Sequence, residues 1–243
     1  MPDSAADQDH PAAAPSAAVR AQLLATEHWS LLASRSTTQS EVLSRISMLL
    51  NLVSAALVSL ALVGQATQFS DTFVIFAIAV LAIVSLTGLL TQVRVMHVGN
   101  EDLMYVLAMN RLRAAYVELD PGIDRSLMAS RFDDRAGLAQ TYFFLQPKRG
   151  AIQFFGSSMM FTIAVNSTLC GLLAAAITGV SGAGTPSLIT VGVLVCLGFA
   201  AWSTWWGGRR FRAVWRDYVP LHPSPTIGGR PARLPEEQES AQP

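Results

Sequence analysis

The sequence predicts an all-α integral membrane protein, with four transmembrane helices arranged as two hairpins and a helical cytoplasmic segment between them. Three observations predict this class. Of the 243 residues, 51% are hydrophobic and only 14% are charged, whereas about a quarter of a soluble chain is charged. Four uncharged runs are each long enough to cross about 30 Å of hydrocarbon. Lys and Arg are absent from the short turn inside each pair of runs.

The four uncharged runs cover residues 46–69, 72–93, 150–179 and 188–208. A spanning helix needs about 20 apolar residues, whereas helices at the surface of soluble proteins carry a polar face. We therefore expect one transmembrane hairpin over residues 46–93 and a second over residues 150–208.

The placement of Lys and Arg predicts the orientation. The turns Gly64–Asp71 and Gly179–Ser187 contain neither residue type, and every Lys and Arg lies in the N-terminal arm, the central segment or the C-terminal tail. Cytoplasmic loops are enriched in these residues. We therefore expect these three segments, and both termini, to lie in the cytoplasm, with the protein in the inner (cytoplasmic) membrane.

The segments outside the hairpins differ in composition. We expect residues 1–16 to be a disordered tail, 17–45 an amphipathic helix, 94–149 a helical segment, and 209–243 a basic stretch followed by a tail that is disordered from His222 onward.

The N-terminal arm, residues 17–45, carries apolar residues at helical spacing. They are Val19, Leu23, Leu24, Leu31 and Leu32. The arm can lie on the inner leaflet or pack against the central segment. Packing is favoured, because only Arg20, Arg35 and Arg45 are basic and a helix that binds anionic lipid usually carries a denser basic face.

The central segment, residues 94–149, contains a second helical pattern. Gly99 is expected to bend or interrupt the helix, Asn100 to cap a new one, and Pro121 to end it. The new helix carries an apolar stripe at heptad-type spacing, which suits helix–helix contact. The stripe consists of Tyr105, Met109, Leu112, Tyr116 and Leu119.

Charged residues beside this stripe leave alternatives open. Arg111 and Arg113 fall away from the stripe, either as solvated groups or as partners of an anion or carboxylate. Arg111 and Glu118 are too far apart to pair within one turn, so each needs a partner from another helix. Asp133 and Asp134 are adjacent and project apart, and too few oxygen ligands lie nearby to predict a metal site.

Polar and small residues mark the expected helix contacts within the spans. Small side chains recur every four residues at Ser167, Gly171, Ala175 and Gly179, and again at Gly192, Cys196, Ala200 and Thr204. This spacing favours close packing, either between these two spans or between subunits. Asn51 and Asn166 are the most polar side chains in the spans, where they either hydrogen-bond between helices or line a pore.

Aromatic residues gather at the ends of the second hairpin. At the entry to the third span they are Tyr142, Phe143, Phe144, Phe154 and Phe155, and at the exit from the fourth span they are Trp202, Trp205 and Trp206. Both groups fall at the predicted inner boundary of the membrane, so we interpret them as an interfacial aromatic belt.

Several functional classes are disfavoured. The net charge is zero, which gives no basis for binding nucleic acid. Cys170 and Cys196 lie inside apolar runs, where thiols pack as small hydrophobes. No span contains an ionisable residue, although coupled transporters usually keep one. Nucleotide-binding, hydrolase and zinc motifs are absent, so we expect no enzyme, cofactor or metal.

The chain resembles known membrane proteins in one run and in its layout. The run NRLRAAYVELDPGIDRSLMASRFDDRAG resembles a segment of an uncharacterised family of actinobacterial multi-pass membrane proteins, which implies the topology but no activity. In layout, residues 17–119 are similar to the SLATT family, through the motifs EHW and RLRAAY. That similarity implies a membrane effector of a pore-forming kind that is linked to nucleotide signals. The second hairpin departs from the two-span plan of that family.

Two functions remain. The first is a non-enzymatic scaffold whose cytoplasmic helices bind a membrane or cytoplasmic protein partner, or further copies of the chain as a homo-oligomer, with the lipid bilayer as its environment. The second is an oligomeric pore or channel-like effector, suggested by Asn51, Asn166 and the small-residue stripes.

Overall fold

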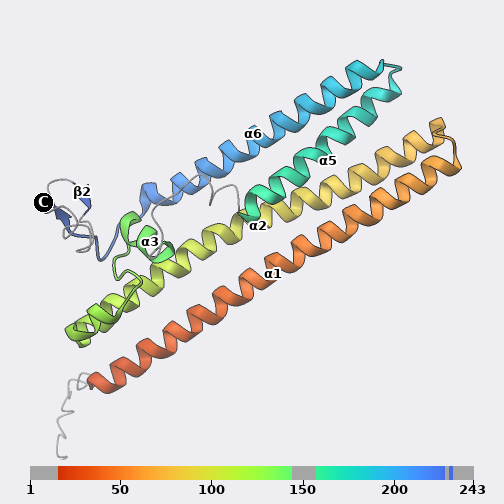
Figure 1. Ribbon diagram of the computed structural model, residues 1–243. Helices are drawn as coiled ribbons and strands as arrows, with labels where there is room; N and C mark the ends of the chain where they lie inside the picture. The colour runs from red at the N-terminus through yellow and green to blue at the C-terminus, as the bar shows by residue number, and fades with distance from the viewer. Residues whose placement is uncertain (1–15, 144–156, 228–229, 232–243) are drawn as a thin grey trace, which may run out of the picture.

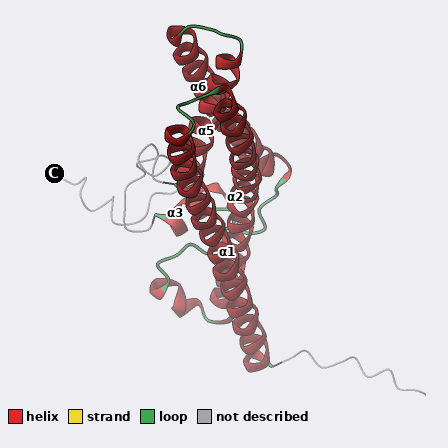
Figure 2. Ribbon diagram, turned by 90° about the vertical axis from the view of Figure 1, so that its right-hand side faces the viewer, coloured by secondary structure: helices red, strands yellow, loops and turns green. Residues whose placement is uncertain are grey.

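The computed structural model describes residues 16–143, 157–227 and 230–231. Its elements, in chain order, are the helices α1 (Ala17–Ala66) and α2 (Asp71–Leu119), the short 3-10 helix η1 (Pro121–Ser126), the helices α3 (Arg135–Tyr142), α5 (Ser158–Val180) and α6 (Thr185–Asp217), and the strands β1 (Thr226–Ile227) and β2 (Arg230–Pro231). The two strands form a minimal antiparallel pair, with Thr226 opposite Pro231. In Figure 2 nearly all of the described chain is helical, so the all-α class is confirmed.

Four helices are long and apolar enough to cross a membrane: α1, α2, α5 and α6. They form two hairpins, α1 with α2 and α5 with α6 (Figure 1). Both short turns lie at the same end of the molecule, which we call the turn end, whereas η1 and α3 lie toward the opposite end, the α3 end. Gln68 and Phe69 close the first turn with positive φ.

α2 is the central helix of the bundle, because it contacts α1 on one side and α5 on another. Near the turn end, Ala56 of α1, Leu81 and Val84 of α2, and Leu169 of α5 form one buried cluster. Farther along α2, Val42 and Ile46 of α1 pack on Val95 and Val98. α6 lies outside α5 and contacts α2 only briefly, so most of its surface faces outward.

The predicted interruption at Gly99 and Asn100 is wrong. α2 runs through both residues without a break. A glycine inside a helix costs only about 1 kcal/mol, and Val98 and Leu103 on either side of the site are buried. The packing of Val98 and Leu103 outweighs the helix-destabilising effect of Gly99. The second span and the start of the central segment therefore form one continuous helix. α1 likewise runs unbroken from Ala17 to Ala66, capped by the Ser16 hydroxyl, so the predicted helical arm and the first span form one helix.

The second hairpin differs from its predicted bounds. The part of the expected third span before residue 157 lies outside the described residues, and α5 begins at Ser158. α6 does not end at Gly208 but continues to Asp217. Val214 and Trp215, on this extra stretch, pack against the cluster around Leu103 and Leu138, and this contact explains the extension.

Candidate functional site

Asp133 joins three parts of the chain at the α3 end. Its side chain is fully buried. One carboxylate oxygen accepts hydrogen bonds from Arg111 Nε at 2.6 Å, the Tyr218 hydroxyl at 2.8 Å and the Leu221 N–H at 3.0 Å, and the other accepts from the His222 N–H at 2.7 Å. α2, the loop before α3 and the segment after α6 therefore meet at one carboxylate.

Asp134, the next residue, binds other groups of the same region. Its carboxylate caps α3 through the Gly137 N–H at 2.7 Å and accepts from the N–H and hydroxyl of Ser224, each at 2.8 Å. The predicted disorder of the tail from His222 onward is therefore wrong for His222 and Ser224, since backbone bonds to the two carboxylates hold this stretch in place. Sequence composition cannot reveal bonds made by backbone groups.

Hydrogen bonds and burial determine the charge of this site. Burial alone raises the pKa of Asp133, but the bonds from Leu221, Arg111, His222 and Tyr218 outweigh it and lower the pKa to about 2. Burial and the bond to Asp133 raise the pKa of Tyr218 to about 12. Near neutral pH the carboxylate is charged and the phenol is protonated. The site is thus suited to holding segments together and not to exchanging protons.

Arg111 and Arg113 have different partners. Arg111 pairs with Asp133, and its guanidinium also lies 5.5 Å from the ring centroid of Tyr218. Arg113 donates to the Asn110 side-chain oxygen at 2.7 Å, and the Asn110 amide donates to the Phe132 carbonyl at 2.8 Å. Both arginines thus have internal partners, while 41% of the Arg111 side chain remains exposed.

Asp102 forms a second junction, which the sequence analysis missed. Its carboxylate accepts from Arg35 Nε at 2.6 Å and Gln39 Nε2 at 2.9 Å, both on α1. It also accepts from the hydroxyl of Tyr142 on α3, and burial together with this bond raises the pKa of Tyr142. The sequence does place Arg35 and Gln39 on the same face of a helix, at i and i+4. Nothing in the sequence indicates which carboxylate accepts their hydrogen bonds.

The predicted stripe on α2 faces the rest of the chain only in part. Met109 is buried, and Tyr105 packs at the edge of the same cluster. The Tyr116 ring stacks on His28 of the arm with centroids 6.0 Å apart, whereas Leu112 and Leu119 are only partly buried. Three residues outside the stripe, Leu103, Val106 and Leu107, join Met109 in a buried cluster with Leu138 of α3. α2 has partners on several sides, so a single heptad stripe describes only one of them.

The two asparagines of the spans lie in different environments. Asn166 is fully buried, and its amide donates to the Gly88 carbonyl at 2.8 Å and to Gln92 Oε1 at 2.7 Å, both on α2. Its own oxygen lies against Gly88, where an added Cβ would come within 2.1 Å of it. Asn166 therefore joins two helices. Asn51 is exposed on α1, on the side away from α2.

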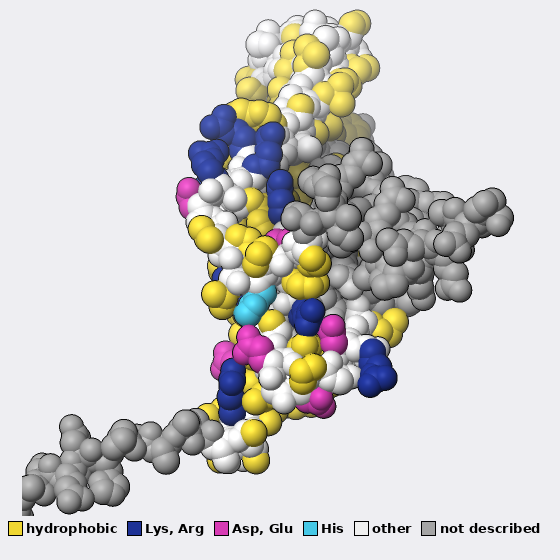
Figure 3. Space-filling model, turned by 90° about the vertical axis from the view of Figure 1, so that its left-hand side faces the viewer, with side chains coloured by type: hydrophobic (Ala, Val, Ile, Leu, Met, Phe, Trp, Pro, Cys, Tyr) yellow, Lys and Arg dark blue, Asp and Glu magenta, His cyan; other side chains and the backbone are white. Residues whose placement is uncertain are grey.

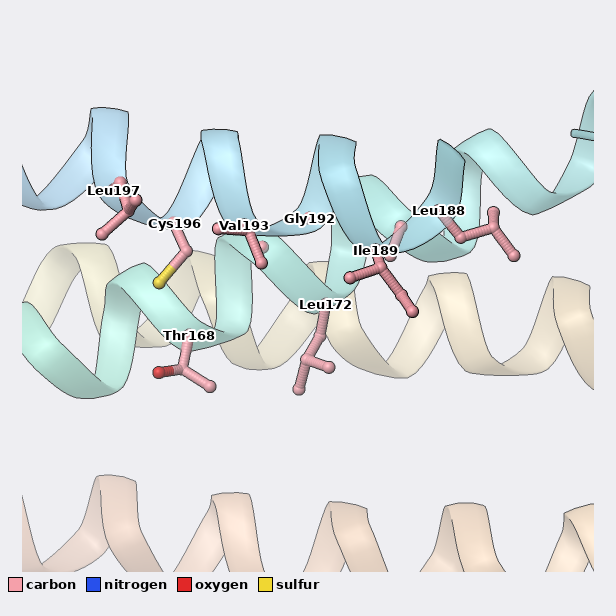
Figure 4. A pocket seen from close by; sticks show the side chains of 10 residues that line it. Thr168, Leu172, Leu188, Ile189, Gly192, Val193, Cys196 and Leu197 are labelled. Atoms are coloured by element: carbon pink, nitrogen blue, oxygen red, sulfur yellow. The ribbon is translucent and has the colours of Figure 1, made fainter. Parts of the chain in front are cut away.

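The small-residue stripes bring α5 and α6 into close contact. An added Cβ on Gly171 would lie 2.6 Å from the Gly192 carbonyl oxygen and 3.0 Å from the Cys196 Cβ, and one on Gly192 would lie 3.3 Å from the Ala175 Cβ. The sequence left open whether the stripes pack between these two spans or between subunits. In the structure they pack between the two spans. The shallow groove beside it, about 370 Å³, is lined by aliphatic side chains with Thr168 and Cys196 (Figure 4), which offer few polar groups to orient a ligand.

Comparisons of the chain with family models, with curated proteins and with solved structures find no match.

Proposed function

We propose that this chain is a multi-pass protein of the inner membrane that acts as a non-enzymatic scaffold, with the N-terminal arm as its docking element. The helices α1, α2, α5 and α6 are the four spans, and the α3 end lies in the cytoplasm. The absence of Lys and Arg from both turns, and the position of both turns at one end of the bundle (Figure 1), support this orientation.

The arm is built as a projecting rod. Residues 17–45 precede the first span in the same unbroken helix, so the arm extends roughly 40 Å at 1.5 Å per residue. Ion pairs join it to α2 at three levels: Arg20 with Glu118 at 3.1 Å, Arg35 with Asp102 at 2.6 Å, and Glu41 with Arg94 at 2.7 Å. A helix continuous with a span and tied to its neighbour in this way does not lie flat on the leaflet.

The observation that carries the proposal is the outer face of the arm. Trp29 is 71% exposed and Leu23 is 63% exposed, while His28 and Leu31, on the inner face, contact α2. Trp29 lies 17 residues before the first span, roughly 25 Å from it, and lipid does not cover it there. Exposed Trp residues are frequent anchors of protein interfaces.

A photocrosslinking amino acid at position 29, introduced into the full chain in living cells, tests the scaffold proposal. We expect an adduct with one protein, either a second copy of this chain or a single partner identified by mass spectrometry. Position 125, exposed on η1, controls for exposure, and position 109, buried, controls for the interior. If position 29 gives no adduct, or the same adducts as position 125, the arm is not the docking element.

One observation favours the second function, an oligomeric pore. Asn51 presents an amide on the outer face of α1 within the first candidate span, where lipid offers it no hydrogen-bond partner. A second copy could supply one, and such bonds are worth about 1 kcal/mol. The resemblance of residues 17–119 in layout to the SLATT family would imply the same role, although the second hairpin departs from that family's plan. Conductance of the purified protein in planar bilayers that is lost in Asn51→Leu would support the pore, and silence of the unchanged chain would count against it.

A further inference from the structure

The end of α6 carries a cluster of arginines that have no carboxylate partner among the described residues. They are Arg209, Arg210, Arg212 and Arg216, all exposed. Within the described residues, the ion pairs with carboxylates involve Arg20, Arg35, Arg45, Arg94, Arg111 and Arg131, and none of the α6 arginines. Asp217 is the single acidic residue on this stretch. Among the described residues, the cluster is therefore a concentration of positive charge without an ion-pair partner. Figure 3 shows Lys and Arg side chains gathered next to the apolar end of the molecule.

Two of these arginines contact the rings of tryptophans that lie one helical turn earlier on α6. The guanidinium of Arg209 lies 5.0 Å from the Trp205 ring centroid, and that of Arg210 lies 4.5 Å from that of Trp206. Trp206 in turn stacks on Trp202 with centroids 5.8 Å apart. All three contacts follow from the i, i+4 spacing along one helix. These cation–π contacts restrain both guanidinium groups without using their N–H donors in ion pairs.

The depth of the cluster matches a lipid headgroup. The uncharged run of α6, residues 188–208, is about 31 Å long at 1.5 Å per residue, close to the hydrocarbon thickness. Arg209 follows directly, and Arg209, Arg212 and Arg216 share one face at i, i+3 and i+7. The arginines therefore lie within roughly 12 Å of the hydrocarbon boundary. Buried Ser203 marks the opposite face, against the bundle.

We infer that this arginine and tryptophan cluster is a binding site for the headgroup phosphate of an anionic phospholipid. The inference rests on the proposed membrane location of the chain. Guanidinium groups bind phosphate oxygens in a two-pronged geometry, and Trp rings sit at headgroup level. The arginines of the arm differ, because each is paired with a carboxylate: Arg20 with Glu118, Arg35 with Asp102, and Arg45 with Glu41.

Quenching of Trp fluorescence by brominated lipids tests the site in the full chain reconstituted into vesicles. One set contains brominated phosphatidylglycerol in plain phosphatidylcholine, and the other has the bromines on phosphatidylcholine. We expect preferential quenching by the anionic lipid, reduced at least about threefold in R209Q/R210Q, since each arginine at the surface contributes about 1 kcal/mol toward anionic lipid. R125Q/R131Q removes the same charge outside the cluster, on η1 and in the loop before α3, and it should leave the preference unchanged.

The outcomes separate this inference from the proposed location. Equal quenching by both lipids in the unchanged chain, or an equal loss of preference in both double variants, overturns the lipid site but leaves the membrane location intact. Absence of quenching by either lipid overturns the membrane location itself. Soluble glycerol 3-phosphate should not reduce the preference at millimolar concentration. If it abolishes the preference, the site takes a free phosphate and the lipid assignment is wrong.

Discussion

At the residue scale, Asp133 determines how the α3 end is held together. It is a buried carboxylate whose partners come from α2 and from the segment after α6. The sequence indicated only that Asp133 and Asp134 point apart. Two of the donors are backbone N–H groups of Leu221 and His222, which have no sequence signature, so the role of Asp133 could not be predicted.

Asp133→Asn should loosen the segment after α6. The amide that replaces one oxygen cannot accept the bonds that this oxygen receives, and Arg111 loses its charge partner. We expect the stability to fall by about 2–3 kcal/mol, in the range for hydrogen bonds to charged groups. Hydrogen exchange followed by mass spectrometry should show faster exchange of the Leu221 and His222 amides. Asp124→Asn, which breaks only the looser 3.5 Å pair with Arg131, should leave those amides unchanged.

The same junction predicts a dependence on acid pH. The pKa of Asp133 is lowered on folding to about 2, from an unfolded value near 4. Its stabilising contribution is therefore complete above about pH 4 and is lost as the pH falls toward 2. Protection of the Leu221 and His222 amides should be constant from pH 7 to about 4 and then decrease. The decrease should be absent from Asp133→Asn, and a loss of protection already near pH 6 would contradict the assignment.

At the element scale, the two glycines of α2, Gly88 and Gly99, lie in different surroundings. An added Cβ would lie 2.1 Å from Asn166 Oδ1 at Gly88, whereas at Gly99 nothing lies within 4 Å. The sequence drew attention to Gly99 and to Asn166 but not to Gly88. The reason is physical: whether a helical glycine bends the helix or receives a neighbour depends on what packs there, and only the tertiary structure supplies that neighbour.

Gly88→Ala and Gly99→Ala therefore form a matched pair on one helix. Gly88→Ala should displace Asn166 and destabilise the protein by about 1–3 kcal/mol, as overpacking does. Gly99→Ala should be neutral or stabilise it by up to about 1 kcal/mol, because Ala favours helix. Thermal unfolding in detergent, followed by circular dichroism, measures both. Destabilisation by Gly99→Ala would show that α2 bends at this residue, as the sequence analysis expected.

Gly171 provides the corresponding test for the second hairpin. Its added Cβ would meet the Gly192 carbonyl oxygen at 2.6 Å, a backbone atom that moves only if α5 and α6 separate. We expect Gly171→Ala to lower the unfolding temperature. Gly198→Ala on α6, where nothing lies within 4 Å, should not. Equal effects of the two substitutions would mean that the small-residue stripes do not set the distance between these helices.

At the scale of the whole molecule, the hydropathy of the sequence was enough to predict the fold class. The positions of the charged residues were not enough to predict which helices contact one another. The four runs correspond to α1, α2, α5 and α6, because apolar length is a property of the sequence alone. The extension of α6 and the continuity of α2 through Gly99 could not be predicted. Both depend on packing around Leu103 and Leu138, which come together only after the chain has folded.

The central claim is that the four helices cross the membrane with the arm and the α3 end in the cytoplasm. Single cysteines at the exposed serines Ser36, Ser70, Ser126 and Ser181, in a Cys170→Ala/Cys196→Ala background, test it with a membrane-impermeant maleimide. The claim predicts labelling of positions 70 and 181 in intact spheroplasts, and of positions 36 and 126 only in inside-out vesicles. Labelling of positions 36 and 70 from the same side of the membrane would contradict it.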